Sequence, residues 1–342
     1  MRSYITLILI IILNAYSLSN INYINNSFNK QLTWIILEIL IYIFANKINK
    51  HIIYKNIFKI YLIFNVLLLY ILLFGNAING SKAWISFASF SLQPSEFMKM
   101  ILIILLNMIP FIYDKYHLKN TILVLIPSIL TFLEPDTGNV IFYLLIIIIV
   151  FLLHEKQKNI IKLVISCFII SFFILFMYLN YKQIFIDLFG VYRINRIETL
   201  LNKESYQLNM SLISIGSAGL YGSKNLIKVP FFETDFAFCL LTSLHGFIGS
   251  VIYLLINMLL NIVILIHSQK VPKLERNIII TFLLVKIVQE SINILMTIGI
   301  VPITGITLPL VSYGGSSLMI YAFMLGLINN NSYYMDKQGK VA

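Results

Sequence analysis

Long apolar stretches alternate with short polar ones along almost the whole chain. The run from Tyr143 to Leu153, for example, contains no charged or amide side chain. A helix that is apolar on all sides belongs in a lipid bilayer, where about 20 residues cross the hydrocarbon core. The pattern therefore predicts an all-α integral membrane protein of about ten transmembrane helices. We expect these helices at residues 4–18, 32–46, 57–75, 98–113, 120–133, 139–153, 160–179, 236–266, 277–300 and 314–330.

Two of these segments need comment on length. Residues 236–266 would be too long for one straight span at about 1.5 Å per residue, and His245, Gly246 and Gly249 mark a break or re-entrant turn. The first segment follows Met1 and Arg2 as a signal peptide would. Because further apolar segments follow it, we expect it to remain as the first membrane helix.

Composition and charge agree with a membrane location. Of 342 residues, 59% are hydrophobic and 11% are charged, whereas soluble domains carry roughly 25% charged residues. The net charge of +11 lies mainly in short connections, which indicates membrane topology and not a nucleic-acid partner. The positive-inside rule places both termini in the cytoplasm. The basic residues on that side are Lys47, Lys50, Lys55, Lys59, Lys115, Lys119, Lys156, Lys158, Lys162, Lys270, Lys273, Arg276, Lys337 and Lys340.

Four polar segments then lie outside, at 76–97, 134–138, 180–235 and 301–313. The third is the longest and connects the seventh and eighth predicted helices. We expect residues 1–342 to form one polytopic membrane domain with no soluble domain. Neither cysteine, Cys167 nor Cys239, resembles half of a disulfide or a metal ligand, because both lie in apolar segments.

The first two outer segments contain helix-start signals. Pro94 suits the first turn of a helix, and Glu96 complements the helix dipole. Trp84 is typical of the aromatic belt at a membrane interface. In the tight turn from Glu134 to Asn139, Asp136 is placed to cap the next helix. Taken alone, these residues favour structural roles.

The third segment carries positive charge that indicates an anionic ligand. Arg193, Arg196, Lys224 and Lys228 place positive charge outside, against the topological trend. An anionic ligand such as a pyrophosphate would account for them. Asp235 lies where this segment meets the membrane, so its carboxylate is a candidate base. An N-cap on the next helix explains Asp235 equally well.

Charged residues also occur inside predicted spans. Lys286 and Glu290 are four residues apart in one apolar segment, so we expect them to pair on the bundle interior. Glu38 is a lone intramembrane acid, for which a function and a structural hydrogen bond are both open. The last outer segment, Val301 to Ser317, contains two prolines and three glycines, which predicts irregular backbone lining a cavity. No metal cluster, phosphate-binding loop or nucleophile elbow appears.

Together these motifs resemble the SEDS family of bacterial shape, elongation, division and sporulation proteins, which includes RodA-, FtsW- and SpoVE-like members. The resemblance covers about Asn79 to Leu327. Its strongest part is the run from Pro302 to Ser317. The other matching blocks are Gln93 to Lys99, Pro135 to Gly138, Tyr206 to Gly222 and Thr234 to Phe236.

This resemblance implies a peptidoglycan glycosyltransferase of the bacterial cytoplasmic membrane. It would polymerise lipid II onto an undecaprenyl-pyrophosphate-linked glycan beside a class B penicillin-binding protein, within membrane lipid. The family's catalytic acid corresponds to Asp235. No cofactor is certain, and a divalent cation such as Mg or Mn is the candidate to assist the leaving group. The expected substrate-binding residues are Trp84, Glu96, Lys99, Arg193, Arg196, Gln207, Thr234, Ser312 and Ser316.

The chain also departs from the family pattern. Ala83 replaces the arginine before the tryptophan, and Ser243, Leu244 and His245 replace a Glu-Glu-Leu sequence. Both acids of that block are lost, so a non-catalytic scaffold for the penicillin-binding protein is an alternative to the enzyme. A lipid II flippase is a further alternative. The short tails favour an elongation role, as in RodA-like members, over a division role.

Overall fold

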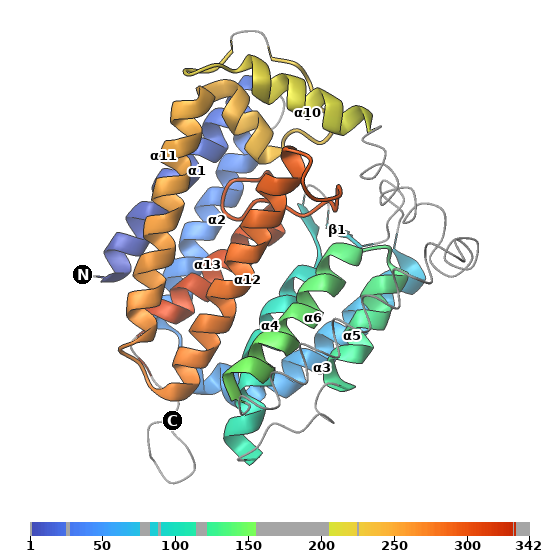
Figure 1. Cartoon of the computed structure of the whole chain (residues 1–342). Coiled ribbons are helices and arrows are strands. Elements are labelled where there is room, and N and C mark those ends of the chain that lie inside the picture. The colour runs from blue at the N-terminus through green and yellow to red at the C-terminus, as the bar shows by residue number, and fades with distance from the viewer. Residues whose placement is uncertain are drawn as a thin grey trace.

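The computed structural model describes residues 2–24, 28–75, 83–87, 90–113, 122–154, 205–223, 226–330 and 332. These residues are almost entirely helical (Figure 1). The helices are α1 (Arg2–Ile24), α2 (Phe28–Lys47), α3 (Lys50–Phe74), α4 (Pro94–Tyr113), α5 (Ile122–Leu133), α6 (Thr137–His154), α10 (Tyr206–Ser217), α11 (Ala237–Ser268), α12 (Lys273–Thr297) and α13 (Gly315–Asn329). Strands β1 (Ile85–Phe87) and β2 (Phe90–Leu92) form an antiparallel hairpin in which Ile85 pairs with Leu92.

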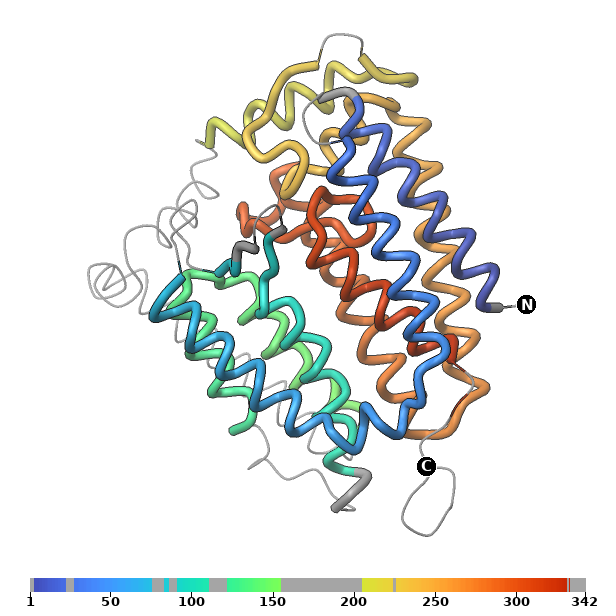
Figure 2. Tube along the Cα trace, turned by 180° about the vertical axis from the view of Figure 1, so that it is seen from behind, coloured from blue at the N-terminus to red at the C-terminus, as the bar shows by residue number. Residues whose placement is uncertain are grey.

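The long helices form two groups that run roughly side by side (Figures 1 and 2). One contains α1, α2, α11, α12 and α13, and the other contains α3, α4, α5 and α6. Helix α4 joins the groups by packing against both α12 and α13. Helix α10 lies across one end of the bundle, above α11 and α12.

The predicted membrane segments agree with these helices. Nine of the ten coincide with helices α1 to α6 and α11 to α13, and residues 160–179 lie outside the described part. Among the described residues, six helices are long and apolar enough to cross a membrane, and α5 and α13 are shorter apolar helices. The break expected in the long eighth segment is present, because Gly246 has φ 67° and ψ −167° within the 32-residue helix α11.

Several helices extend beyond their apolar runs because polar side chains pair between them. Helix α1 continues past residue 18, and α2 begins before residue 32. Gln31 Nε2 donates to Ser17 Oγ at 2.9 Å, and Asn14 Nδ2 donates to Glu38 Oε2 at 2.8 Å. Glu38 is fully buried. The structural hydrogen bond considered for this acid is therefore present.

Both ends of the described chain meet the connection between α2 and α3. Asn46 Nδ2 donates to Ser3 Oγ at 2.8 Å, and Asn330 Nδ2 donates to Ala45 O at 3.1 Å. At the same end Lys50 forms a buried ion pair with Glu275 at 3.1 Å. The two ends of the described part of the chain thus lie at one end of the bundle, as an even number of spans between them requires.

Candidate functional site

The polar segments expected outside the membrane come together at the opposite end of the bundle. Gln93 Nε2 donates to Asp136 Oδ2 at 2.8 Å, which joins the first segment to the second. Gln93 N also donates to Ser316 Oγ at 3.0 Å, at the start of α13. Ser312 Oγ donates to Thr234 O at 2.6 Å, which joins the fourth segment to the third. The described parts of all four segments therefore build one region.

Asp235 belongs to a tight turn that leads into α11. The carbonyl oxygen of Phe231 accepts the backbone N–H groups of Thr234, Asp235 and Phe236 at 3.2, 3.1 and 3.1 Å. Phe231 has φ 59°, an uncommon value for a bulky residue. A backbone conformation of this kind persists only where the surroundings hold it in place.

The restraints on this turn come from the C-terminal third of the chain. Three successive backbone carbonyls of the turn each accept one hydrogen bond from a residue in that part of the chain. The three bonds are Tyr313 N to Glu233 O at 2.8 Å, Ser312 Oγ to Thr234 O at 2.6 Å, and Asn293 Nδ2 to Asp235 O at 2.8 Å. With its N–H groups bound inside the turn and its carbonyls bound outside, the peptide backbone beside Asp235 has little freedom to move.

The Asp235 side chain faces the loop at residues 301–313, which we call the terminal loop. A Cβ added to Gly305, where φ is 71°, would lie 3.5 Å from Asp235 Oδ2. Asp235 is half-buried. Helix α11 begins at Ala237, and its N-cap position is Phe236 with no side-chain cap bond. The N-cap explanation of Asp235 is therefore wrong.

Asp136 is the centre of a second cluster, beside the start of α4. Its carboxylate accepts from Gln93 Nε2 at 2.8 Å, Ser95 Oγ at 2.7 Å and Asn139 Nδ2 at 2.9 Å. Asn139 N donates to Asp136 Oδ1 at 3.2 Å, so the predicted capping role is confirmed. Tyr143 OH adds a bond of 2.8 Å to Ser95 O. These contacts join the starts of α4 and α6.

Lys99 lies in a third cluster, deeper in the bundle. Its ammonium donates to Glu96 Oε2 at 2.9 Å and to Gln289 Oε1 at 2.7 Å. It also lies 4.9 Å from the centre of the Phe142 ring. Tyr321 OH donates to the same Gln289 oxygen at 2.7 Å. Lys99 has no exposed surface, so in this arrangement it joins α4 to α12 and presents nothing to a ligand.

The remaining predicted binding residues are distributed differently. Trp84 is half-buried just before β1, next to the buried Ala83. Ser316 is buried and accepts from Gln93 N, and its own hydroxyl donates to Ser91 O at 3.2 Å. Gln207 is half-buried on α10, and no described contact brings it to Asp235. Arg193 and Arg196 lie outside the described residues.

Ser243 and Leu244 lie where the family pattern has its two acids, and the described side chains of this block make neutral contacts. Ser243 Oγ lies 2.7 Å from Ser214 Oγ on α10, and His245 Nε2 lies 3.0 Å from Ser19 Oγ on α1. The Tyr16 ring meets the His245 ring edge-on, with centroids 5.3 Å apart. These side chains pack three helices together at the break in α11. In the described part of this block, no carboxylate takes the place of the missing pair.

Sequence reasoning missed two residues of α12. Asn293 Nδ2 donates to Asp235 O and to Ile306 O, and Gln289 Nε2 donates to Thr307 O at 3.1 Å. The available signal was a polar stripe at helical spacing through an apolar segment, which includes Gln289 and Asn293 four residues apart. The expected partner within that stripe is confirmed, because Lys286 Nζ donates to Glu290 Oε1.

Two acids near the site have altered titration. Burial of Glu134, with a smaller contribution from the charge of Asp136, raises the pKa of its carboxyl to about 8. Both carboxyl oxygens of Glu134 lack a hydrogen-bond partner. At this pKa Glu134 is mostly protonated at neutral pH. Burial also raises the pKa of Glu233, which belongs to the Asp235 turn.

The residues that the structure describes form no group of three or more His, Cys, Asp or Glu side chains that could hold a metal ion. Asp235 and Glu233 are the carboxylates of the turn itself. Magnesium sites use one or two carboxylates together with substrate phosphates. A divalent cation bound by these two carboxylates would thus take most of its other ligands from the substrate.

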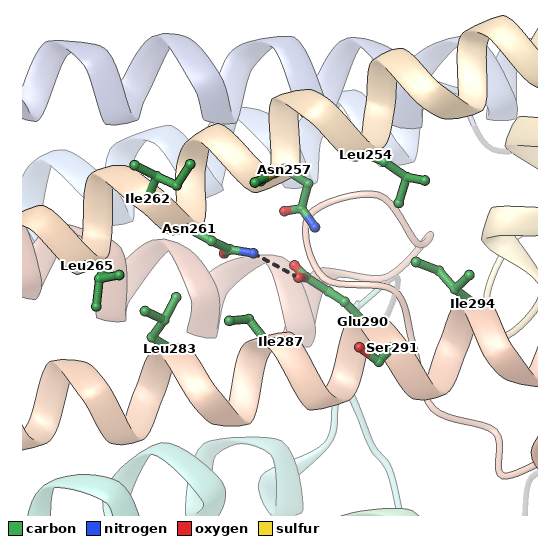
Figure 3. Close-up of a pocket in the computed structure, with 11 residues that line it drawn as sticks. Leu254, Asn257, Asn261, Ile262, Leu265, Leu283, Ile287, Glu290, Ser291 and Ile294 are labelled. Carbon is green, nitrogen blue, oxygen red and sulfur yellow. Dashed lines mark hydrogen bonds between the residues drawn. The ribbon is translucent and has the colours of Figure 1, made fainter.

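A pocket of about 340 Å³ opens between α11 and α12 (Figure 3). Apolar side chains such as Leu254, Ile287 and Ile294 line it, and Asn261 Nδ2 donates to Glu290 Oε2 at its polar edge, at 3.4 Å. None of the predicted site residues lines this pocket. It lies along the membrane-spanning parts of both helices, apart from the Asp235 turn.

The chain matches a family model described as FTSW_RODA_SPOVE, cell cycle protein, over residues 2–337. It is 31% identical over 303 residues to the probable peptidoglycan glycosyltransferase FtsW of Wigglesworthia glossinidia brevipalpis, covering 80% of this chain and 76% of the relative. It is 31% identical over 284 residues to stage V sporulation protein E of Bacillus subtilis, covering 76% and 74%.

Solved structures share the fold. A chain from a structure described as "Structural coordination of polymerization and crosslinking by a peptidoglycan synthase complex" superposes with a TM-score of 0.78 at 24% identity, covering 95% of this chain and 96% of that one. The rod shape determining protein RodA of Thermus thermophilus superposes with a TM-score of 0.68 at 23% identity, covering 94% of each chain. At this identity the likeness concerns the fold alone.

Proposed function

Because the chain belongs to the FtsW/RodA/SpoVE family of cell cycle proteins, we propose that it polymerises lipid II at the outer face of the bacterial cytoplasmic membrane. Peptidoglycan glycosyl transfer is the activity named for its FtsW relatives. The chain is accordingly a peptidoglycan glycosyltransferase, and its multi-span fold agrees with a substrate that carries a lipid tail. Both termini are then cytoplasmic.

The observation that carries this proposal is the Asp235 turn. A carboxylate on a rigid turn, at the end of a membrane helix bundle, can take a proton from a sugar hydroxyl that approaches from outside. We assign that proton to the 4-hydroxyl of the acceptor N-acetylglucosamine. Its oxygen then attacks the anomeric carbon of the lipid-linked chain, the bond to undecaprenyl pyrophosphate breaks, and the configuration inverts.

The leaving pyrophosphate gains negative charge as its bond to the sugar breaks. Arg193 and Arg196, which belong to the same outer segment as Asp235, are our candidates to stabilise it. Lys228 lies in the described part of the same segment, where it is exposed and adds positive charge to that segment. Trp84, Gln207 and Ser312 remain candidates for contacts with the sugars.

The loss of the acidic pair leaves Asp235 without its usual carboxylate neighbours. The neutral contacts of Ser243 and His245 preserve the helix packing at that position. The proton-accepting group and the turn that holds it are both retained. We therefore favour the enzyme over a non-catalytic scaffold, and we make the scaffold an outcome of the test.

Two further features concern the cellular role. Several relatives are FtsW proteins, and FtsW-like members are the division type, so we propose a division-type role over an elongation role. We also propose that a class B penicillin-binding protein crosslinks the product, since one structural neighbour is part of a complex that polymerises and crosslinks. Rescue of a division-deficient strain, but not an elongation-deficient one, would support the first point.

The decisive experiment measures polymerisation of labelled lipid II by the purified protein, with and without its class B penicillin-binding protein. Asp235→Asn keeps the size of the side chain but removes the base, so we expect the rate to fall by about 10²–10⁴-fold. Long strands from wild type and none from the variant would support the proposal. Equal products would exclude Asp235 as the base. No product from folded wild type with its partner would favour the scaffold.

A further inference from the structure

Asn293 bridges two segments that meet at Asp235. It lies near the outer end of α12 and has no exposed surface. Its amide Nδ2 donates one hydrogen bond to Asp235 O at 2.8 Å and a second to Ile306 O at 2.7 Å. Each of the two amide hydrogens thus binds a backbone carbonyl, one in the Asp235 turn and one in the terminal loop.

The rest of α12 holds the same stretch of the terminal loop. Gln289, one turn earlier, donates to Thr307 O at 3.1 Å. Met296 Sδ accepts from Thr304 N at 3.2 Å. The loop residues 304, 306 and 307 are therefore fixed to one helix face, and Asn293 alone of these three side chains also reaches the Asp235 turn among the described contacts.

The cost of burying Asn293 suggests a role beyond packing. Its Oδ1 has no hydrogen-bond partner, and leaving a buried polar atom unsatisfied is destabilising. An apolar side chain would avoid this cost within a membrane helix. The amide instead satisfies the carbonyl of the residue that carries the proposed base.

We propose that Asn293 is a positioning residue that holds the Asp235 backbone against the terminal loop. The Asp235 carboxylate is thereby kept beside Gly305, where an added Cβ would lie 3.5 Å from Asp235 Oδ2. This inference rests on the proposed function. Asn293 itself touches no reacting atom, so its loss should affect the rate of the chemical step and leave substrate binding largely intact.

The test compares Asn293→Leu with the matched control Asn107→Leu. Asn107 is also fully buried in a helix, and its amide also donates two hydrogen bonds, to Ile103 O at 2.9 Å and Thr281 Oγ1 at 3.0 Å. Its Oδ1 likewise lacks a partner. Each substitution therefore removes two hydrogen bonds donated by a buried amide, and only Asn293 lies next to Asp235.

In the lipid II polymerisation assay we expect Asn293→Leu to lower kcat by about 10–100-fold with KM nearly unchanged, because small misplacements of a reacting group can cost about 100-fold. Asn107→Leu should keep kcat. If Asn293→Leu does not fold, Asn293→Gln takes its place, because it keeps the amide but moves it further from the backbone. We expect Asn293→Gln to lower kcat as well. An unchanged kcat in folded Asn293 variants, or equal losses in both positions, would overturn the proposal. If Asp235→Asn were fully active, the proposed base would be wrong, whatever Asn293 does.

Discussion

At the scale of single residues, the buried polar side chains bind either residues close to them in the chain or residues that only the folded chain brings near. Lys286 and Glu290 were expected to pair because four residues separate neighbours on a helix face. The cap formed by Asp136 was expected for the same reason. Asn293 could not be identified in this way, because its acceptors belong to residues 235 and 306 and only the folded chain brings them together.

Glu134 provides a prediction about pH at this scale. Burial raises the pKa of Glu134 to about 8 in the folded state, whereas an unfolded glutamate releases its proton near its ordinary pKa of 4.5. Its contribution to the free energy of unfolding is fully present below pH 4.5 and is lost as the pH rises to about 8. The slope can reach about 1.4 kcal/mol per pH unit.

Thermal unfolding in detergent across this pH range, for wild type and Glu134→Gln, measures the effect. The glutamine is neutral at every pH, so the variant should lose stability less steeply as the pH rises from 4.5 to 8. Parallel profiles for the two proteins would show that Glu134 is not the titrating group.

At the scale of elements, the break in α11 was predicted from its length, but what fills it was not. Phe247 N donates to Gly219 O at 3.0 Å, Ile248 N donates to Leu220 O at 3.1 Å, and Ser223 N donates to Ser243 O at 2.9 Å. The segment after α10 thus satisfies backbone groups that the break would otherwise leave without partners. Nothing in the sequence of residues 218–223 indicates that they insert there.

This contact gives a prediction for Gly246. A Cβ at Gly246 would collide with Gly222 N and Leu220 O, and its φ of 67° disfavours any other residue. We expect Gly246→Ala to lower the free energy of unfolding by about 1–3 kcal/mol. The control is Gly216→Ala in α10, where an added Cβ meets nothing within 4 Å. If chemical unfolding gave the same loss in the free energy of unfolding for both variants, this explanation of Gly246 would be wrong.

At the scale of the whole molecule, the alternation of apolar and polar segments predicted nine of the described helices and the gathering of the described polar segments at one end of the bundle. It did not predict how the helices divide into two groups. That division depends on close contacts such as Gly315 against the ring of Trp34 and Gly326 against Tyr42 in the packing of α13 on α2. Such complementarity is a property of surfaces, and hydropathy does not record it.

Inside the bilayer-spanning bundle, removing one member of a buried ion pair should cost much more stability than removing both members. Lys286 Nζ donates to Glu290, and to Asn257 Oδ1 and Asn261 Oδ1 at 2.8 Å each, which joins α12 to α11. Lys286→Met alone should cost about 3–5 kcal/mol, because it leaves a carboxylate in an apolar environment without its counter-charge. Lys286→Met with Glu290→Gln should recover most of that loss. A double variant no more stable than the single one, by unfolding in mixed micelles, would contradict this explanation.

The hydrogen bonds that fix the Asp235 turn have a consequence for how the protein is made. Ser312 follows Thr234, whose carbonyl it binds, by 78 residues. A ribosome therefore delivers the aspartate to the membrane well before it synthesises the groups that hold it. Until α12, the terminal loop and α13 have been inserted, the turn has none of its outer restraints. A partly synthesised chain would carry the proposed base without the geometry to use it, so activity would begin only after the terminal loop has been synthesised and inserted.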